Sequence, residues 1–328
     1  MKDDVLEHWS MHLSSLRGVD LLGPFNVRAE AWISFIEGTK RPLERFCVTQ
    51  SPLFDRQCLE ALHKRCRSSL VDLRLKETSK LDDDWLSLVA NFMNLASLDI
   101  SRPARSISDN ALIALLAQIG NKLSRLDVSG HEDLTDRVLV EGVKLHATKL
   151  ASFSAADLPL LTDEGVSQFF GAKLEPGASA AQDVEMQDKE GNTASDTEDT
   201  VMIDGGDDID DINDAPEVDA ICNLPPLEQV DLSRSPALGS KALAALLQHS
   251  GKTLRDLNIN QWKDVDNETL LILGPSAPHL IQVNIGWCRN VDNFAVKALL
   301  DNCPKLKLIL CAGCNRLTGD CPRKVRII

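Results

Sequence analysis

Leucines recur along the chain at a nearly constant spacing, in the pattern Leu-x-x-Leu-x-Leu with leucine or another apolar residue at each position. Ten copies begin at Leu16, Leu43, Leu70, Leu95, Leu123, Leu150, Leu227, Leu254, Leu280 and Leu306. Successive copies begin 25 to 28 residues apart, except that 77 residues separate the sixth copy from the seventh. A period of this length, kept over so many copies, indicates a repeat architecture and not a chance enrichment in leucine.

Each copy predicts a short strand followed by a helix. The alternation in Leu73-Arg74-Leu75 and in Leu126-Asp127-Val128 is that of a strand with one buried face. A polar residue that can cap a helix then follows an apolar one, as in Ile107-Ser108-Asp109 and Leu161-Thr162-Asp163. Because one strand and one helix cannot bury their apolar faces alone, neighbouring copies must stack. The pattern therefore predicts an α/β leucine-rich-repeat solenoid, a horseshoe with a parallel β-sheet on the concave face and α-helices on the convex face.

The repeats divide the chain into four segments. Residues 1–15 predict a helix of an incomplete preceding repeat, with Leu6 and Leu13 on its apolar side, so the chain is expected to begin inside a repeat. Residues 16–171 contain six leucine-rich repeats, and residues 223–328 contain four more and the C-terminal end. Residues 172–222 are an insertion, and the repeats that flank it must still stack on each other.

The insertion carries the charge imbalance of the chain. The formal net charge is -14, and the stretch from Asp183 to Asp219 holds 15 acidic residues and one basic residue, Lys189. Low hydrophobicity and high charge predict that the insertion is disordered. Thr193 and Ser195 each have an acidic residue three positions later, which makes them candidate phosphorylation sites. The alternative interpretation is a solvated spacer.

The cysteines and histidines do not predict a metal site. The nine cysteines recur at positions related by the repeat, which indicates reduced thiols in small buried slots, and Trp262 occupies the slot that Cys288 has in the next repeat. His8 and His12 are spaced to share a helix face, but no third ligand is near. The cysteines that could form a tetrahedral zinc site are Cys303, Cys311, Cys314 and Cys321. Because these match repeat positions, we expect no metal and no cofactor.

The sequence favours a binding protein over an enzyme. It contains no G-x-S-x-G nucleophile motif, no P-loop and no dinucleotide-binding fingerprint, and its histidines are scattered. It also has no secretion signal at its start and no apolar run of membrane-spanning length. We therefore expect a protein of the nucleus or cytosol that binds neither a membrane nor a small-molecule substrate.

Two columns of residues are expected on the surface of the solenoid. The residue between the two inward positions of each strand must point out of the concave sheet. That column is rich in Asp and Asn, which we interpret as small polar residues that the repeat tolerates, and it includes Arg74. A second column, just past the strands, carries guanidinium and indole groups of the kind enriched at interfaces. The candidate binding residues are Arg74, Arg102, Arg234, Gln261 and Trp287.

The repeat pattern Leu-x-x-Leu-x-Leu-x-x-Cys…Leu-Thr-Asp, together with Asn302-Cys303-Pro304-Lys305-Leu306, resembles a known family. It is similar to the cysteine-containing leucine-rich repeats of F-box and related ubiquitin-ligase receptors, over nearly the whole chain. Two segments narrow the resemblance, Leu22-Gly23-Pro24-Phe25-Asn26-Val27 with Trp32 and Phe35, and the run from Cys314 to Arg323. These look like the fungal Rad-seven family of nucleotide-excision-repair proteins.

This resemblance implies a nuclear, non-catalytic subunit that acts in global genome nucleotide excision repair. It implies a Snf-type ATPase with a RING finger, elongin C and a cullin as partners, with damaged DNA reached only indirectly. The family's N-terminal segment, including its elongin-binding box, is not in this chain, and the acidic insertion is a departure from the family. The repeats alone leave an alternative open, a generic F-box-like substrate receptor or scaffold unrelated to DNA damage.

Overall fold

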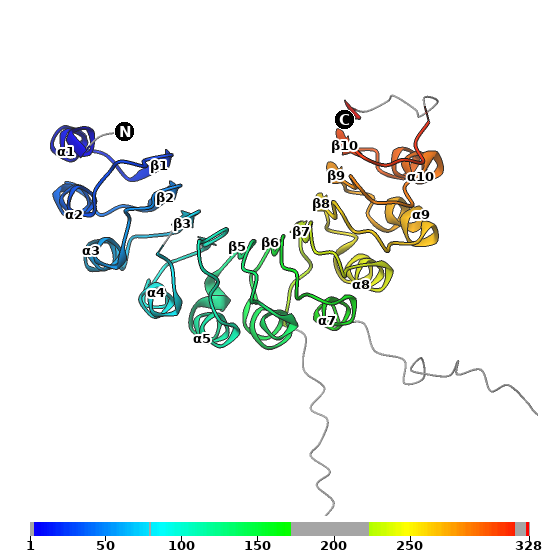
Figure 1. Ribbon diagram of the computed structural model, residues 1–328, viewed down its shortest axis with the longest axis horizontal. Coiled ribbons are helices and arrows are strands. Elements are labelled where there is room, and N and C mark those ends of the chain that lie inside the picture. The colour runs from blue at the N-terminus through cyan, green and yellow to red at the C-terminus, as the bar shows by residue number, and fades with distance from the viewer. Residues whose placement is uncertain (1–2, 79, 172–222, 319–325, 328) are drawn as a thin grey trace, which may run out of the picture. The chain divides into compact units, whose positions relative to one another are not determined.

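Each leucine pattern forms one strand, and in the first nine repeats a helical segment follows that strand. The computed structural model describes residues 3–78, 80–171, 223–318 and 326–327. The strands pair in parallel and in chain order in one sheet. The repeats on both sides of the insertion form one compact unit. Within this unit the strands line the inner side of an arc, and the helices line its outer side (Figure 1). The predicted leucine-rich-repeat solenoid is therefore confirmed.

The strands are short, and the helices begin a few residues after each strand ends. The strands of the ten repeats are β1 (Gly18–Leu22), β2 (Arg45–Thr49), β3 (Asp72–Lys76), β4 (Ser97–Asp99), β5 (Arg125–Asp127), β6 (Ser152–Ser154), β7 (Gln229–Asp231), β8 (Asp256–Asn258), β9 (Gln282–Asn284) and β10 (Leu308–Leu310). The α-helices are α1 (Asp3–His12), α2 (Ala29–Gly38), α3 (Arg56–Cys66), α4 (Asp83–Val89), α5 (Asp109–Ile119), α6 (Lys144–His146), α7 (Asp163–Phe169), α8 (Ser240–Ser250), α9 (Asn267–Ser276) and α10 (Asn293–Asn302). A 3-10 turn, η1 (Gly120–Lys122), follows α5, and a π-helical segment, η2 (Val138–Val143), leads into α6.

Two features at the ends of the chain differ from the sequence prediction. The first helix ends at His12, earlier than the expected residue 15, because the chain turns at Ser14 and Ser15, residue types that favour turns over helix interiors. Leu13 is therefore exposed, whereas Leu6 is buried as expected. In addition, a short strand that the leucine pattern did not predict, β11 (Arg326–Ile327), pairs in parallel with β10.

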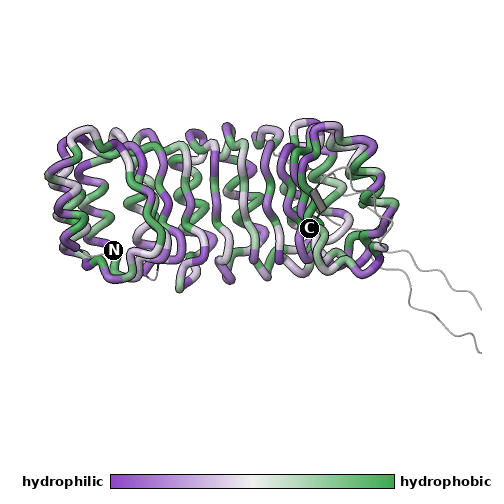
Figure 2. Tube along the Cα trace, turned by 90° about the horizontal axis from the view of Figure 1, so that it is seen from above, coloured by the Kyte–Doolittle hydropathy of each residue, from purple (hydrophilic) through white to green (hydrophobic). Residues whose placement is uncertain are grey.

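The apolar positions of the repeat form the core. Most leucines of the patterns are buried, and Leu70, Leu73 and Leu75 have no exposed surface. Hydrophobic stretches recur in every part of the stack, between hydrophilic ones (Figure 2). Full burial of one leucine side chain contributes roughly 1.5 to 3 kcal/mol, so stacking supplies the stability that a single repeat lacks.

The Leu-Thr-Asp motif both caps a helix and ties two repeats together. The hydroxyl of Thr162 accepts a hydrogen bond of 3.0 Å from the backbone N–H of Gly165 and so caps α7. Asp136, from the preceding repeat, accepts bonds of 2.9 and 2.6 Å from the backbone N–H and the hydroxyl of Thr162. Asp109 holds Thr135 in the same way, with bonds of 2.9 and 2.5 Å. The motif therefore sets the spacing between neighbouring helices.

The repeats on the two sides of residues 172–222 stack as direct neighbours. Strand β6 pairs with β7, and Asp163 accepts hydrogen bonds of 2.8 and 2.9 Å from the backbone N–H groups of Gly239 and Ala242. The expected stacking across the insertion is confirmed. The insertion itself lies outside the described residues, so its predicted disorder and the candidate phosphorylation sites Thr193 and Ser195 remain predictions.

One buried position, which recurs behind the sheet in several repeats, holds a side chain that donates a hydrogen bond to the preceding repeat. The indole Nε1 of Trp262 donates a 2.8 Å hydrogen bond to the carbonyl of Leu232, in the preceding repeat. The thiols of Cys288 and Cys314 donate to Ile259 and Ile285 at 3.4 and 3.2 Å. Burial raises the pKa of the Cys288 thiol to about 12, so it stays a protonated donor. The buried placement predicted for Trp262 and for the cysteines is confirmed for those that the structure describes.

The described residues bring together no group of three or more side chains that could hold a metal ion. Cys303, Cys311 and Cys314 lie in their repeat slots, while Cys321 is outside the described ranges. The rings of His8 and His12 lie against each other on α1, with their centroids 4.2 Å apart. None of the described helices has the length and apolar character needed to cross a membrane.

Candidate protein-interaction surface

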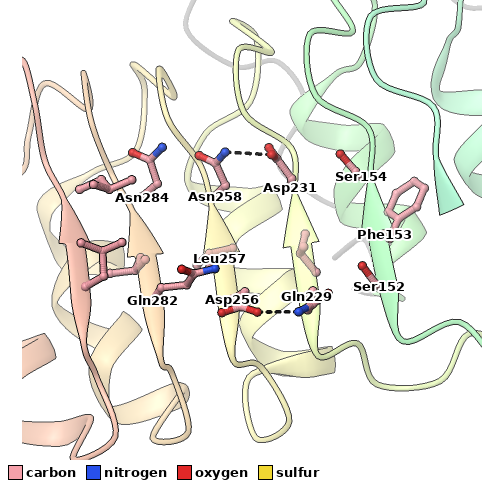
Figure 3. A pocket seen from close by; sticks show the side chains of 14 residues that line it. Ser152, Phe153, Ser154, Gln229, Asp231, Asp256, Leu257, Asn258, Gln282 and Asn284 are labelled. Atoms are coloured by element: carbon pink, nitrogen blue, oxygen red, sulfur yellow. Dashed lines mark hydrogen bonds between the residues drawn. The ribbon is translucent and has the colours of Figure 1, made fainter. Parts of the chain in front are cut away.

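From β4 to β9, the last residue of each strand projects a polar side chain from the concave face. On β7, β8 and β9 these are Asp231, Asn258 and Asn284, which stand in one row (Figure 3). Each side-chain oxygen accepts a hydrogen bond from the backbone N–H two residues later, at 3.0, 3.2 and 3.1 Å. Asp99 and Asp127 bond in the same way to Ser101 and Ser129. The row therefore has a structural role, because it holds the turn that ends each strand.

A second polar row lies two residues earlier on the same strands, at Gln229, Asp256 and Gln282 (Figure 3). The amide of Gln229 donates to the carboxylate of Asp256 at 2.7 Å, and Asn258 donates to Asp231 at 2.9 Å. The two rows line a shallow hollow of about 360 Å³ across β6 to β10. Its floor offers amide donors and carboxylate acceptors, the groups that recognise a peptide backbone and polar side chains.

Arg74 lies apart from the other candidate binding residues. It is on β3, and its guanidinium contacts the nearly buried carboxylate of Asp72 at 3.1 and 3.3 Å. Arg45 approaches the same carboxylate at 3.4 Å. Because a buried carboxylate requires a compensating charge, Arg74 has a structural task within the sheet. Its role in binding remains a prediction.

The other candidates, Arg102, Arg234, Gln261 and Trp287, occupy one equivalent position, the third residue after the strand. All four have left-handed backbone conformations, with φ values of 52°, 62°, 69° and 59°. Three other repeats have a glycine there, and the full set, which we call the turn column, is Gly23, Gln50, Glu77, Arg102, Gly130, Asp157, Arg234, Gln261, Trp287 and Gly313. The predicted second column therefore exists as one backbone site per repeat.

The turn column is held by the backbone, and its side chains are free to vary. The N–H of Arg102 donates to the carbonyl of Ser129 at 2.7 Å, and the N–H of Trp287 donates to that of Ala312 at 2.8 Å. Large side chains lean over a glycine in the next repeat. A Cβ on Gly130 would lie 3.0 Å from Cγ of Arg102, and one on Gly313 would lie 2.5 Å from Cδ2 of Trp287. These glycines leave room for the side chain of the preceding repeat.

The structure divides the turn-column candidates into two groups. Arg102 and Arg234 line one hollow of about 310 Å³ together with Lys76. Arg234 also lies 3.7 Å from the carboxylate of Asp157, with both side chains about half exposed. Gln261 and Trp287 line a separate hollow of about 440 Å³ nearer the C-terminus.

Besides Gly313, three residues of the second hollow were not among the sequence-based candidates. Lys263, Arg289 and Asn315 line it beside Trp287. Each stands two residues after a turn-column residue, so the repeat spacing itself contained the signal that could have identified them.

The chain has relatives among DNA repair proteins, although no protein-family model matches it. It is 28% identical to the DNA repair protein rhp7 of Schizosaccharomyces pombe over 97% of its own length and 48% of the relative's. It is also 25% identical to the DNA repair protein RAD7 of Saccharomyces cerevisiae, over 93% of its own length and 46% of the relative's. The chain is homologous to these two fungal proteins. It spans about half the length of the curated rhp7 and RAD7 sequences.

The fold also matches a solved structure, the crystal structure of the Rad7 and Elc1 complex in yeast. The TM-score is 0.74 at 23% sequence identity, and the match covers 100% of this chain and 71% of that chain. At this identity the likeness establishes a shared fold. The resemblance to the Rad-seven family expected from the sequence is confirmed by the homology to rhp7 and RAD7.

Proposed function

We propose that this chain is the repeat region of a non-catalytic binding subunit of a nuclear DNA repair complex, acting in global genome nucleotide excision repair. The observation that carries the proposal is the homology to rhp7 and RAD7 over 97% and 93% of the chain. Nearly all of the solenoid takes part in that match, so the likeness is not confined to a few leucine-rich repeats.

A binding role also fits the way in which the polar groups of the concave face are used. Asp99 and Asp127 are paired residues on β4 and β5 and could suggest a carboxylate pair for acid–base chemistry. Burial is the main cause of the raised pKa of Asp127, and the negative charge of Asp99 raises this pKa further. However, Asp99 accepts bonds of 3.0 and 2.6 Å from Ser101, and Asp127 accepts one of 3.0 Å from Ser129. Each carboxylate therefore stabilises the turn after its strand. This structural role supports the proposal that the chain is a binding scaffold and not an enzyme.

The partners that we propose for the full-length subunit, of which this chain is the repeat region, are elongin C, a cullin and a Snf-type ATPase with a RING finger. The proposal of elongin C is supported by the matching crystal structure, which contains Rad7 with Elc1. The cullin and the ATPase rest on the family resemblance in the sequence. Damaged DNA would be reached through these partners, because the charges outside the acidic stretch are balanced and phosphate binding requires a clustered basic face.

The surface that we propose for partner binding is the concave face with the adjoining turn column. Arg102 and Arg234 present guanidinium groups in one hollow, and Gln261 and Trp287 form the other. Arg and Trp are the residue types most enriched among binding hot spots. Arg74 extends this surface toward the N-terminal repeats, where its guanidinium is about one-third exposed.

The test is affinity purification of the tagged full-length gene product from its own cells, before and after ultraviolet irradiation, followed by mass spectrometry. Recovery of a Snf-type ATPase with elongin C and a cullin is the expected result. Recovery of a Skp-type adaptor with an unrelated substrate, and without the ATPase, would contradict the repair function and establish a generic F-box-like receptor.

A further inference from the structure

We propose that the hollow around Trp287 is a docking site for an extended acidic peptide segment of a protein partner. The site, which we call the Trp287 site, consists of Gln261, Lys263, Trp287, Arg289, Gly313 and Asn315. The proposal goes beyond the repair function and does not rest on it, because a leucine-rich-repeat receptor for any substrate could use such a site.

Trp287 is a large aromatic side chain that the fold does not require. Its side chain is 59% exposed, and its φ of 59° is uncommon for a bulky residue. Glycine occupies the same position in other repeats, for example Gly130 and Gly313. The hydrogen bond from Trp287 to Ala312 is made by the backbone and needs no side chain. The turn therefore does not need the indole, and an exposed tryptophan of this kind is a candidate binding residue.

The indole is held as a flat platform. A Cβ on Gly313 would lie 2.5, 2.7 and 2.8 Å from Cδ2, Cε2 and Cε3 of Trp287, so the ring covers that glycine. A partly immobilised aromatic ring loses little conformational entropy when a partner covers it. An aliphatic, proline or aromatic side chain of a peptide could pack on the exposed face of this ring.

Two cations flank the platform without a neutralising partner. Lys263 and Arg289 are exposed, and neither forms an ion pair with any residue that the structure describes. Arg234, by contrast, lies near Asp157, and Arg74 is bound to Asp72. The uncompensated charge beside an apolar platform is complementary to carboxylates next to an apolar residue.

The amides at the two ends of the site favour a peptide. The side chains of Gln261 and Asn315 line the hollow and can donate to, and accept from, a peptide backbone. A nucleic acid carries a charge on every nucleotide, whereas the site offers two cations and the concave face carries the carboxylates of Asp231 and Asp256. A peptide can place its carboxylates over Lys263 and Arg289 alone.

The experiment is a selection of random 12-residue displayed peptides on the full chain, followed by affinity measurements with the best synthetic peptide. We expect the selected peptides to be acidic, with an apolar or proline residue between the acids. Their affinity should fall at least about tenfold in Trp287→Gly and in the double variant Lys263→Glu, Arg289→Glu. It should also fall as salt is raised from 50 to 500 mM, about the range over which screening acts on exposed charges.

The controls separate binding from folding. Gln50→Gly makes the same change at a turn-column residue with φ 60° in the second repeat and should leave peptide affinity unchanged. Thermal unfolding should show Trp287→Gly to be folded, because glycine adopts this backbone conformation without strain. The double variant Lys263→Glu, Arg289→Glu changes only exposed side chains, so it should remain folded. It therefore still tests the proposal if Trp287→Gly unfolds.

Three results would overturn the proposal. One is a failure to select peptides, or the selection of peptides that are not acidic. Another is equal binding of the selected peptide to the wild type and to both site variants. The third is Trp287-dependent binding of a 12-nucleotide oligo(dT) that displaces the peptide, which would assign the site to single-stranded nucleic acid.

Discussion

At the scale of single residues, the turn column is the most regular feature that leucine spacing does not reveal. The turn-column residue of every repeat is left-handed, and only some of these residues are glycine. For other residues this conformation costs about 1 to 2 kcal/mol. Two hydrogen bonds offset the cost: the Asp or Asn side chain three residues earlier holds the turn, and the turn-column N–H bonds to the next repeat, as at Gln261.

Substitution of Gln261 should reveal this backbone requirement. Gln261→Gly should leave the free energy of unfolding unchanged or raise it by up to about 1 kcal/mol, because φ is 69° there. Gln261→Val should lower it by about 1 to 2 kcal/mol, because a β-branched residue disfavours positive φ. Urea denaturation measures both. In α5, Gln118→Gly should destabilise by about 1 kcal/mol, so glycine should have opposite effects at the two sites.

His131 should make the stability of the chain depend on pH. The ring is fully buried, with Nδ1 accepting from the N–H of Ile107 at 3.3 Å and Nε2 bonded to the carbonyl of Ile100 at 3.0 Å. Burial lowers the pKa of His131 from 6.5 to about 4. Because the unfolded chain then binds a proton at a higher pH than the folded chain, acid favours unfolding. The contribution is complete above pH 6.5 and falls by about 3 kcal/mol as the pH drops to 4.

The variant His131→Asn isolates this effect. Asparagine retains a donor and an acceptor but does not titrate, so the loss of stability from pH 7 to pH 4 should be about 3 kcal/mol smaller than in the wild type. Carboxylates titrate alike in both proteins and cancel in the comparison. Denaturation curves at the two pH values give the answer, and equal losses in the two proteins would rule out a neutral buried His131.

At the scale of elements, the helix caps also act as links between repeats. The carboxylate of Asp136 holds the N-cap residue of the next helix, Thr162, and lies against the backbone of Gly165. A Cβ on Gly165 would lie 1.9 Å from the carboxyl carbon of Asp136. Glycine is therefore needed in the first turn of α7 because of a neighbour in the preceding repeat, and not because of its own backbone.

A double-mutant cycle tests this link. Asp136→Ala should lower the free energy of unfolding by about 1 to 2 kcal/mol, through the loss of two hydrogen bonds. Gly165→Ala should cost about 1 to 3 kcal/mol in the wild type but close to nothing in the Asp136→Ala background, where alanine has room and favours the helix. As a control, Asp83→Ala and Gly165→Ala should be additive, because Asp83 holds a different N-cap residue, Ser108, two repeats before Thr162. Additivity of the Asp136 pair would refute the contact.

At the scale of the whole molecule, the solenoid continues across the insertion through its own contacts. The β6–β7 pairing and the Asp163 bonds to Gly239 and Ala242 resemble those between repeats that are adjacent in sequence. The stability of the repeats should therefore not depend on the acidic stretch, while the charge of the molecule does.

Deletion of residues 183–219 should separate these two properties. The free energy of unfolding should stay the same or rise by up to about 1 kcal/mol, since a shorter loop closes at a lower entropic cost. The formal net charge should change from -14 to zero, so solubility near pH 7 should fall. Chemical denaturation and precipitation assays measure the two effects. A large loss of stability would show that the repeats depend on the deleted residues.

The architecture of the repeats was predictable from the amino-acid sequence alone. Burial of Leu73 and Leu75, the caps at Ser108 and Thr162 and the buried slot of Trp262 were all predictable, because each depends on a short local pattern that the chain repeats. The family resemblance was likewise visible in short segments, and the homology to rhp7 and RAD7 bears it out.

The grouping of the surface residues, by contrast, could be established from the folded chain alone. It paired Arg74 with Asp72, placed Arg102 with Arg234, and brought Lys263 and Arg289 to Trp287. These groupings depend on the curvature of the stack and on the left-handed turn that aims each side chain toward the next repeat. The spacing of the leucines predicts neither the curvature nor the turn. That spacing shows which side chains are buried, but it does not show which exposed side chains lie close together.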